Sequence, residues 1–394
     1  MTRNVITDSA QLASLIEQIE TADRIAIDTE ADSLHSYREK LCLLQISVPA
    51  PGSTANSVDT DLSTAPGRES ARPVCDFMVD PLANTDLEPL RRALEAREIV
   101  LHGADYDLRM LRRGLNLAAK RIFDTLIAAR LLGIREFSLA ALVNRYFGLT
   151  LLKGSQKANW AQRPLPTRMA EYAINDVHYL LPLAEKLEAE LDRCGRRDWL
   201  QQSCQRAIEL AAMARTRNQD ELWRIRGSGV LRGRAAAVLR ALWQWREREA
   251  EKADRPPFHI LRNEDLLKAA AKFASGSVPD YRHFSFRRRQ AFREAAQAAL
   301  QAPESEWPVS RRRSGTRPTT EIVQRAEEFW RRRNKSAEEL GLEPSFIAPR
   351  STLEAIAADC ARAPALLVRW QRELLAVSVF GNEKPVNPQP GSTS

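Results

Sequence analysis

Short apolar runs alternate with amphipathic stretches over the first 200 residues of the chain. The runs predict strands at residues 24–30, 41–48, 76–80, 99–102 and 121–123. Because the first three follow one another without a helix between them, they predict an antiparallel meander. Helical spacing of apolar positions predicts helices near the N-terminus and at residues 86–97, 106–113, 125–132 and 138–147. The whole pattern indicates an α/β domain with a mixed sheet.

From Met169 onward the pattern is helical almost to the end of the chain. Pro182 predicts a bend or a restart in the first long helical stretch. The two helical blocks that follow are similar in size but not visibly in sequence. Residues 49–73 are rich in Pro, Gly, Ser and Thr, which predicts a disordered insertion between two strands. We expect an α/β domain at 1–195, helical domains at 215–302 and 319–380, a linker at 303–318 and a disordered tail at 381–394.

The composition of the chain is that of an ordinary soluble protein, with 44% hydrophobic and 28% charged residues. No apolar run approaches the roughly 20 residues that span a bilayer, so no membrane partner is expected. The five cysteines form no C-x-x-C pair, which argues against a disulfide scaffold and a cysteine zinc site. We therefore expect a reduced, cytoplasmic protein without a small-molecule cofactor, and we take it to be a monomer.

The formal net charge of +8 is concentrated in one part of the chain. Residues 281–335 contain 14 Lys and Arg against six Asp and Glu, which accounts for the whole excess. A basic region of this kind indicates a polyanion partner, most simply nucleic acid. Solvated helix faces are the alternative explanation, since charge runs are weak signals.

Two carboxylates lie at or just beyond the end of the first predicted strand, at a spacing that places them on one face. Asp28 and Glu30 lie at positions i and i+2, where strand side chains point the same way. Like charges on one face repel each other, and a hard divalent cation such as Mg²⁺ relieves that repulsion. A turn or a helix cap is the alternative, because D-T-E-A-D also suits a turn.

Two further segments offer carboxylates at helical positions. Asp107 lies in the first turn of a predicted helix, away from the core-facing Leu108, and Asp105 is the expected N-cap of that helix. Tyr172 and Asp176 are four residues apart, hence on one helix face. Taken singly, each of these residues has an ordinary structural explanation. His102 is expected to be a strand-end residue with a structural hydrogen bond.

The ordered set of motifs resembles the DEDDy family of 3′→5′ exonucleases, and within it ribonuclease D. The residues that carry the resemblance are DTEAD (28–32), HGADYDL (102–108) and YAINDVHYLLPL (172–183). It covers most of residues 1–195 and implies a ribonuclease H-like exonuclease fold. Residues 220–267 resemble an HRDC domain, a small helical bundle that follows the exonuclease domain in ribonuclease D. Residues 337–356 resemble a second, more divergent bundle of that kind.

The resemblance implies a two-metal-ion hydrolase of RNA. Asp28, Glu30 and Asp176 would bind one Mg²⁺ or Mn²⁺ ion, Asp28 with Asp107 would bind a second, and Tyr172 would orient the attacking water. The implied partner is the 3′ end of single-stranded RNA, with precursor tRNA as the family expectation, and the products are nucleoside 5′-monophosphates.

Substrate contacts are less well specified by the sequence. A 3′→5′ DNA exonuclease of repair and an inactive nucleic-acid-binding protein remain alternatives, because the sequence does not show contacts to the 2′-hydroxyl. The presence of all four carboxylates and the tyrosine speaks against the inactive protein. The candidate substrate-binding residues are His102, Lys157, Trp160, Arg224, Arg226, Arg232 and Arg234.

Overall fold

A mixed six-stranded sheet forms the centre of the N-terminal domain in the computed structural model, which describes residues 5–52, 73–151, 154–213, 219–309 and 318–377. The strand order is β1-β4-β3-β2-β5-β6. Strands β2, β3 and β4 are antiparallel neighbours, whereas β5, β6 and the short β1 join as parallel strands. This confirms the predicted meander and the mixed sheet. The strands are β1 (Val5–Ile6), β2 (Arg24–Ala31), β3 (Leu41–Pro49), β4 (Val74–Val79), β5 (Glu98–Leu101) and β6 (Arg121–Asp124).

Helices cover the sheet, so that all but the last residue of β3 is buried. Helix α6 packs against β2, β3 and β4, while α7 packs against β2, β3 and β5. The long helical stretch restarts at Tyr179, and Pro182 lies in the first turn of α7, as predicted. The helices of this domain are α1 (Ser9–Glu20), α2 (Glu88–Glu95), α3 (Asp105–Leu115), α4 (Thr125–Leu131), α5 (Leu139–Phe147), α6 (Thr167–His178), α7 (Leu180–Arg193) and α8 (Arg197–Ala212).

Helix α8 extends the domain beyond its predicted boundary at residue 195. It packs against α3, α4 and β6, and its buried Leu200 and Cys204 belong to the main hydrophobic core. The predicted boundary therefore falls one helix short, because the amphipathic pattern of α8 does not reveal which surface covers its apolar face.

The first helical bundle has the three long helices that the sequence predicts. Trp223 and Trp245 are 3% and 2% exposed, which confirms that they are core residues of the bundle. Its helices are α9 (Arg234–Lys252), α10 (Pro257–Ile260), α11 (Asn263–Ala274) and α12 (Phe286–Gln301), with 3₁₀ turns η1 (Gln219–Glu221), η2 (Ser228–Val230) and η3 (Glu304–Glu306).

The second bundle repeats a local feature of the first. In the first bundle the buried Arg246 of α9 donates to the carbonyl of Leu261, at the end of α10. In the second, the buried Arg333 donates to the carbonyl of Ala348, and in both bundles the acceptor lies 15 residues after the arginine. The two blocks thus share one arginine–carbonyl bond at the same spacing. The helices of the second bundle are α13 (Thr320–Leu340), α14 (Pro344–Ile347), α15 (Arg350–Ala358), α16 (Ala363–Leu366) and α17 (Arg369–Leu374), with the 3₁₀ turn η4 (Cys360–Arg362).

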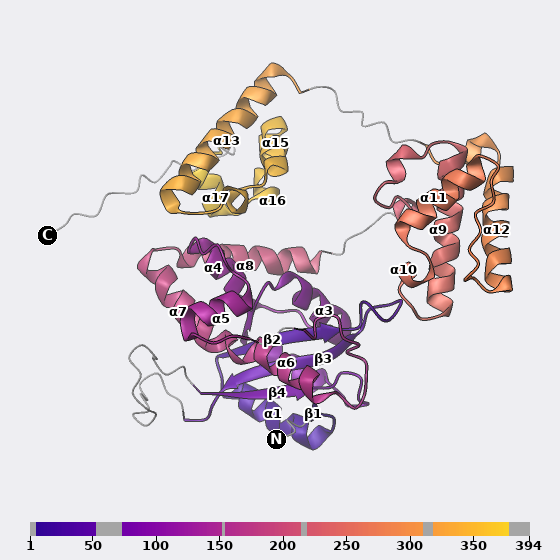
Figure 1. Ribbon diagram of the computed structural model, residues 1–394. Helices are drawn as coiled ribbons and strands as arrows, with labels where there is room; N and C mark the ends of the chain where they lie inside the picture. The colour runs from indigo at the N-terminus through magenta and orange to yellow at the C-terminus, as the bar shows by residue number, and fades with distance from the viewer. Residues whose placement is uncertain (1–4, 53–72, 152–153, 214–218, 310–317, 378–394) are drawn as a thin grey trace.

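Both bundles contact the N-terminal domain, at different places (Figure 1). The second bundle packs on α8, where Trp370 stacks on Trp199 with 4.8 Å between ring centroids. The first bundle meets the loop after β2, where Arg38 pairs with Glu251 at 2.9 Å. Most of the predicted insertion, half of the predicted linker and the whole predicted tail lie outside the described residues. No helix in the described ranges is long and apolar enough to cross a membrane.

Candidate active site

Two carboxylates of the candidate site come from strand β2. Asp28 and Glu30 lie in its last four residues, and they pair across the strand with Gln45 and Leu43 of β3. Since alternate strand residues share a face, both carboxylates point to the same side of the sheet, as predicted. β2 ends at Ala31, so both carboxylates lie at the end of the strand, as predicted.

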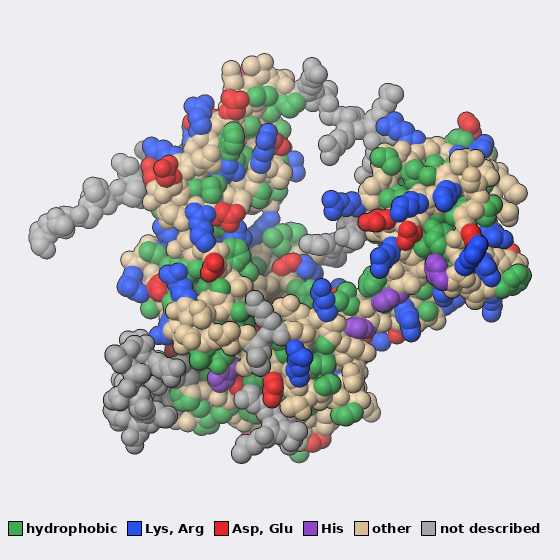
Figure 2. All heavy atoms as spheres, viewed as in Figure 1, with side chains coloured by type: hydrophobic (Ala, Val, Ile, Leu, Met, Phe, Trp, Pro, Cys, Tyr) green, Lys and Arg blue, Asp and Glu red, His purple; other side chains and the backbone are tan. Residues whose placement is uncertain are grey.

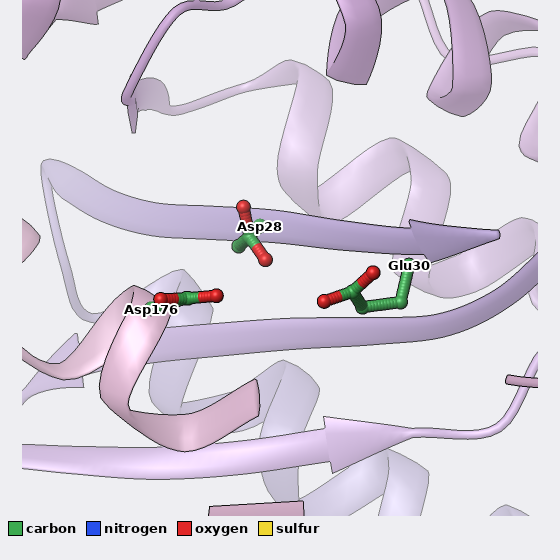
Figure 3. A group of neighbouring side chains, drawn as sticks. All are labelled: Asp28, Glu30 and Asp176. Atoms are coloured by element: carbon green, nitrogen blue, oxygen red, sulfur yellow. The ribbon is translucent and has the colours of Figure 1, made fainter. Parts of the chain in front are cut away.

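Helix α6 brings the third carboxylate to the same place. Oxygen atoms of Asp28, Glu30 and Asp176 all lie within 4.8 Å of one another. Figure 3 shows these three side chains facing one another, two from the strand and one from the helix. The hydroxyl of Tyr172, one helical turn before Asp176, is hydrogen-bonded to the Asp176 carboxylate. The predicted i, i+4 pair therefore does meet on the side of α6 that covers the sheet.

Asp107 is the fourth carboxylate, and it lies near enough to Asp28 and Glu30 for their charges to interact. It is 6% exposed in the first turn of α3, and it accepts a 2.5 Å hydrogen bond from the hydroxyl of Thr29. Its charge is a source of the repulsion that acts on Asp28. The prediction that Asp105 caps this helix is wrong, because Ala104 holds the N-cap position and Asp105 pairs with Arg109.

A buried residue that the sequence analysis did not single out fixes the start of α3. The Asp124 carboxylate accepts hydrogen bonds from the backbone N–H groups of Gly103 and Ala104 at 2.9 and 2.8 Å. It also caps α4 by accepting from Leu126 and Ile127. An Asp immediately before a helix is a recognisable N-cap signal, but its second role depends on a contact across 20 residues. By holding the turn before α3, Asp124 sets the position of Asp107.

Burial raises the pKa of all four carboxyl groups, and the charges of neighbouring carboxylates add to this effect at Asp28 and Glu30. Burial, followed by the charges of Asp107, Asp176 and Glu30, raises the pKa of Asp28 well above its usual range. Burial, followed by the charges of Asp176 and Asp107, raises the pKa of Glu30 to about 9. Burial also raises the pKa of Asp107 to about 7 and that of Asp176 to about 6. A cation among these oxygen atoms would relieve the repulsion, so the site suits a hard divalent metal ion.

The candidate substrate-binding residues around this site differ in burial and in hydrogen bonding. His102 has its Nδ1 atom 2.9 Å from the hydroxyl of Thr125, which confirms the expected structural hydrogen bond. Lys157 is exposed, and its backbone carbonyl accepts from His35. Trp160 is fully buried, with its ring centroid 6.1 Å from that of Tyr172. This burial contradicts a direct substrate contact for Trp160 and makes it a support for the tyrosine.

The segment that carries Trp160 is held by an arginine that the sequence analysis did not single out. Arg163 pairs with Asp80 at 2.6 Å and donates to the carbonyl of Cys42 at 2.7 Å. It also donates to the carbonyl of Trp160 itself. These bonds fix the segment against β3 and the end of β4, so the packing behind Tyr172 is rigidly defined.

The four predicted arginines of the first bundle differ in their surroundings. Arg224 lies over the ring of Trp223 and donates to the carbonyl of Val309, so it is engaged within the bundle. Arg226, Arg232 and Arg234 are exposed. Figure 2 shows that Lys and Arg side chains are spread over both bundles rather than gathered in one patch. The exposed arginines therefore remain predictions for nucleic-acid contact.

Comparison with known families identifies the class of the N-terminal domain. A family model described as 3'-5' exonuclease matches residues 4–192, and a model of the HRDC domain matches residues 235–275. Together with the mixed sheet and its acidic cluster, these matches define a 3′–5′ exonuclease domain followed by an HRDC domain. An exonuclease domain of this class uses divalent metal ions, which fits the four carboxylates.

The chain belongs to the ribonuclease D family. It is 30% identical over 287 residues to ribonuclease D of Escherichia coli, an alignment that covers 71% of this chain and 68% of that protein. It is 35% identical over 272 residues to ribonuclease D of Sphingobium indicum, which covers 68% of this chain and 63% of the relative's length. The family resemblance predicted from the motifs is thus confirmed.

A solved structure agrees over nearly the whole chain. The crystal structure of Escherichia coli RNase D, described as an exoribonuclease involved in structured RNA processing, matches with a TM-score of 0.67 and 23% identity. The match covers 95% of this chain and 97% of that chain. At this identity the likeness shows the fold alone, and it extends through both helical bundles.

Proposed function

We propose that this protein is a 3′→5′ exoribonuclease that removes nucleoside 5′-monophosphates from the 3′ ends of single-stranded RNA. The observation that carries the proposal is the meeting of three carboxylates from β2 and α6 within 4.8 Å, with Asp107 beside them. Precursor tRNA is the proposed natural substrate, and the enzyme acts as a cytoplasmic monomer.

The carboxylates would hold two divalent ions, Mg²⁺ or Mn²⁺. Asp28, Glu30 and Asp176 form the first set, and their mutual distances suit one ion. Asp28 and Asp107 form the second set, supported by the repulsion between their charges. When bound, a pair of such ions lowers the pKa of a water molecule and neutralises charge on the scissile phosphate.

Tyr172 would orient the attacking water through its hydroxyl group. Burial and the neighbouring Asp176 raise the pKa of Tyr172 well above its ordinary value, so the phenol keeps its proton at neutral pH. Its hydrogen bond to Asp176 and the buried ring of Trp160 hold it in one orientation. The protonated hydroxyl is therefore held in a fixed position next to the site where hydrolysis would take place.

The bundles would hold the RNA outside the active site. Exposed arginines such as Arg226, Arg232 and Arg234 can neutralise phosphates irrespective of the base sequence. We propose that the second bundle is also HRDC-like, on the basis of the Arg333 bond that matches the Arg246 bond of the first. His102 and Lys157 remain candidate contacts at the rim of the exonuclease site.

A cleavage ladder tests the proposal. Labelled at the 5′ end, single-stranded RNA and DNA of one sequence are incubated with the protein in Mg²⁺, in Mn²⁺ and in EDTA, beside the Asp28→Asn variant. The expected result is a metal-dependent ladder that shortens RNA from its 3′ end and is absent with Asp28→Asn. Equal or faster trimming of DNA would favour the DNA exonuclease, and binding without cleavage would overturn the proposal.

A further inference from the structure

A buried amide lies beside the acidic cluster and has no partner in the site described so far. The side chain of Gln45 is fully buried. Among the described residues, neither its Nε2 nor its Oε1 atom has a hydrogen-bond partner. A glutamine amide can donate two hydrogen bonds and accept two, and leaving such a group unpaired in the interior is unfavourable. The stability of the fold alone does not account for a polar residue here.

The sheet register places this amide next to Asp28. Gln45 on β3 lies directly opposite Asp28 on β2, and residues opposite each other in an antiparallel pair share a face. On its other side Gln45 faces Met78 of β4, which is apolar and buried. Leu43, two residues earlier on the same face of β3, is also apolar and buried. Gln45 is thus polar between apolar neighbours, and its cross-strand neighbour is a carboxylate of the site.

Helix α6 closes this space from above. It packs against β2, β3 and β4, and it carries Asp176 into the cluster (Figure 3). Ala173, one turn before Asp176, is fully buried in the contact between the helix and the sheet. Gln45 is therefore enclosed between the sheet and α6, and the residue opposite it on β2 is Asp28.

Carboxylates that bind metal ions are themselves held by hydrogen bonds from neighbouring groups. Such outer partners orient the carboxylate, and losing one typically weakens metal binding or activity by about 10- to 100-fold. An amide N–H next to Asp28 has the chemistry and the position for this task.

We propose that Gln45 is a positioning residue: its amide N–H, which has no partner among the described residues, donates a hydrogen bond to Asp28 when that carboxylate binds a divalent cation, and so fixes the orientation of the bound carboxylate. The inference rests on the proposed function, because it assigns Asp28 to the metal site. Gln45 itself touches neither the cation nor the RNA, and acts through Asp28. Leucine or methionine at this position would fill the same space without an unpaired polar group.

The test is the affinity of the full chain for Mn²⁺, measured by calorimetric titration in wild type, Gln45→Leu and Gln45→Met. We expect both variants to bind Mn²⁺ about 10- to 100-fold more weakly than wild type. Their melting temperatures in EDTA are expected to equal or exceed that of wild type. At a fixed Mn²⁺ concentration kcat for RNA should fall while KM for RNA stays unchanged. Met78→Leu, on the same face one strand farther away, is the matched control and should keep wild-type affinity.

Two outcomes would overturn the inference. If both variants bound Mn²⁺ with wild-type affinity, the Gln45 amide would not contribute to cation binding by Asp28. Failure of both variants to fold, with Met78→Leu folding normally, would assign Gln45 a purely structural role. A wild-type protein that binds Mn²⁺ but trims no RNA would refute the proposed function alone, because the Mn²⁺ titration still decides the role of Gln45.

Discussion

Replacing Asp28 by asparagine should stabilise the metal-free protein while it abolishes activity. Asp28 is repelled by Asp107, Asp176 and Glu30, and the oxygen atoms of the metal-binding group lie within 4.8 Å. At that separation two unit charges repel by about 3 kcal/mol with an effective dielectric constant of about 20. Protons that the buried carboxyl groups retain at pH 8 relieve part of this repulsion. We therefore expect Asp28→Asn to increase the free energy of unfolding by about 1–2 kcal/mol in EDTA.

Thermal melting with and without Mg²⁺ measures this effect. In EDTA the melting temperature of Asp28→Asn should rise by about 2–4 °C for each kcal/mol. In Mg²⁺ the order should reverse, since wild type gains about 2.7 kcal/mol at a concentration of 100 times Kd and the variant gains little. Asp105→Asn is the matched control. Asp105 is exposed and, among the residues that the structure describes, pairs with Arg109 on its own helix, so the change should be within about 0.5 kcal/mol.

Two results would refute this reasoning. If Asp28→Asn were less stable than wild type in EDTA, the carboxylate would stabilise the fold and the repulsion would be unimportant. If the variant gained as much stability from Mg²⁺ as wild type does, Asp28 would not be a ligand of the ion.

Three further predictions concern Tyr172, the protonation of the site carboxyl groups and the binding of RNA by the first bundle. Tyr172→Phe should lower kcat for RNA trimming by about 100-fold, with unchanged Mn²⁺ affinity in a titration, because the hydroxyl group is not a metal ligand. Site carboxyl groups such as Glu30, with a pKa of about 9, hold protons in the folded protein that the unfolded chain releases near pH 4. The melting temperature in EDTA should therefore fall as pH rises from about 5 to 9, while the gain from Mg²⁺ should grow. Replacing Arg226, Arg232 and Arg234 together by glutamine should make RNA binding less dependent on salt. The slope of the logarithm of the binding constant against the logarithm of the salt concentration should fall by about one unit for each phosphate that the variant no longer neutralises. Fluorescence anisotropy measures these binding constants.

Each of these predictions has a result that contradicts it. Weakened Mn²⁺ binding in Tyr172→Phe would make the phenol a support of the metal site rather than a partner of the water. Metal-free stability that rises between pH 5 and 9 would mean that the carboxylates are ionised and paired in the folded state. An unchanged salt slope in the triple arginine variant would place the RNA on another surface of the bundles.

The local structure of this protein could be predicted from its sequence. Apolar runs located the five longer strands, and helical spacing located the main helices, because both periodicities follow from backbone geometry. The same geometry placed Asp28 with Glu30 on one strand face and Tyr172 with Asp176 on one helix face. β1 was missed, since two residues carry too little pattern.

Long-range partners could not be predicted in this way. The apolar face of α8 gave no sign that it belongs to the exonuclease core, and nothing local showed that Asp124 holds the turn before α3. Trp160 was predicted as a substrate contact, whereas packing buried it behind Tyr172. The arginine–carbonyl bond that the two bundles share could not be predicted either, because it joins residues 15 positions apart.

The sequence by itself determined which residues could form a metal site, since residue type and spacing along one element are local properties. Only the tertiary structure decided that β2, α3 and α6 place their carboxylates together, with Gln45 buried beside Asp28. Their mutual repulsion, raised pKa values and capacity for a cation arise from distances between segments far apart in the chain. Those distances depend on how the helices pack on the sheet, and no single element specifies that packing.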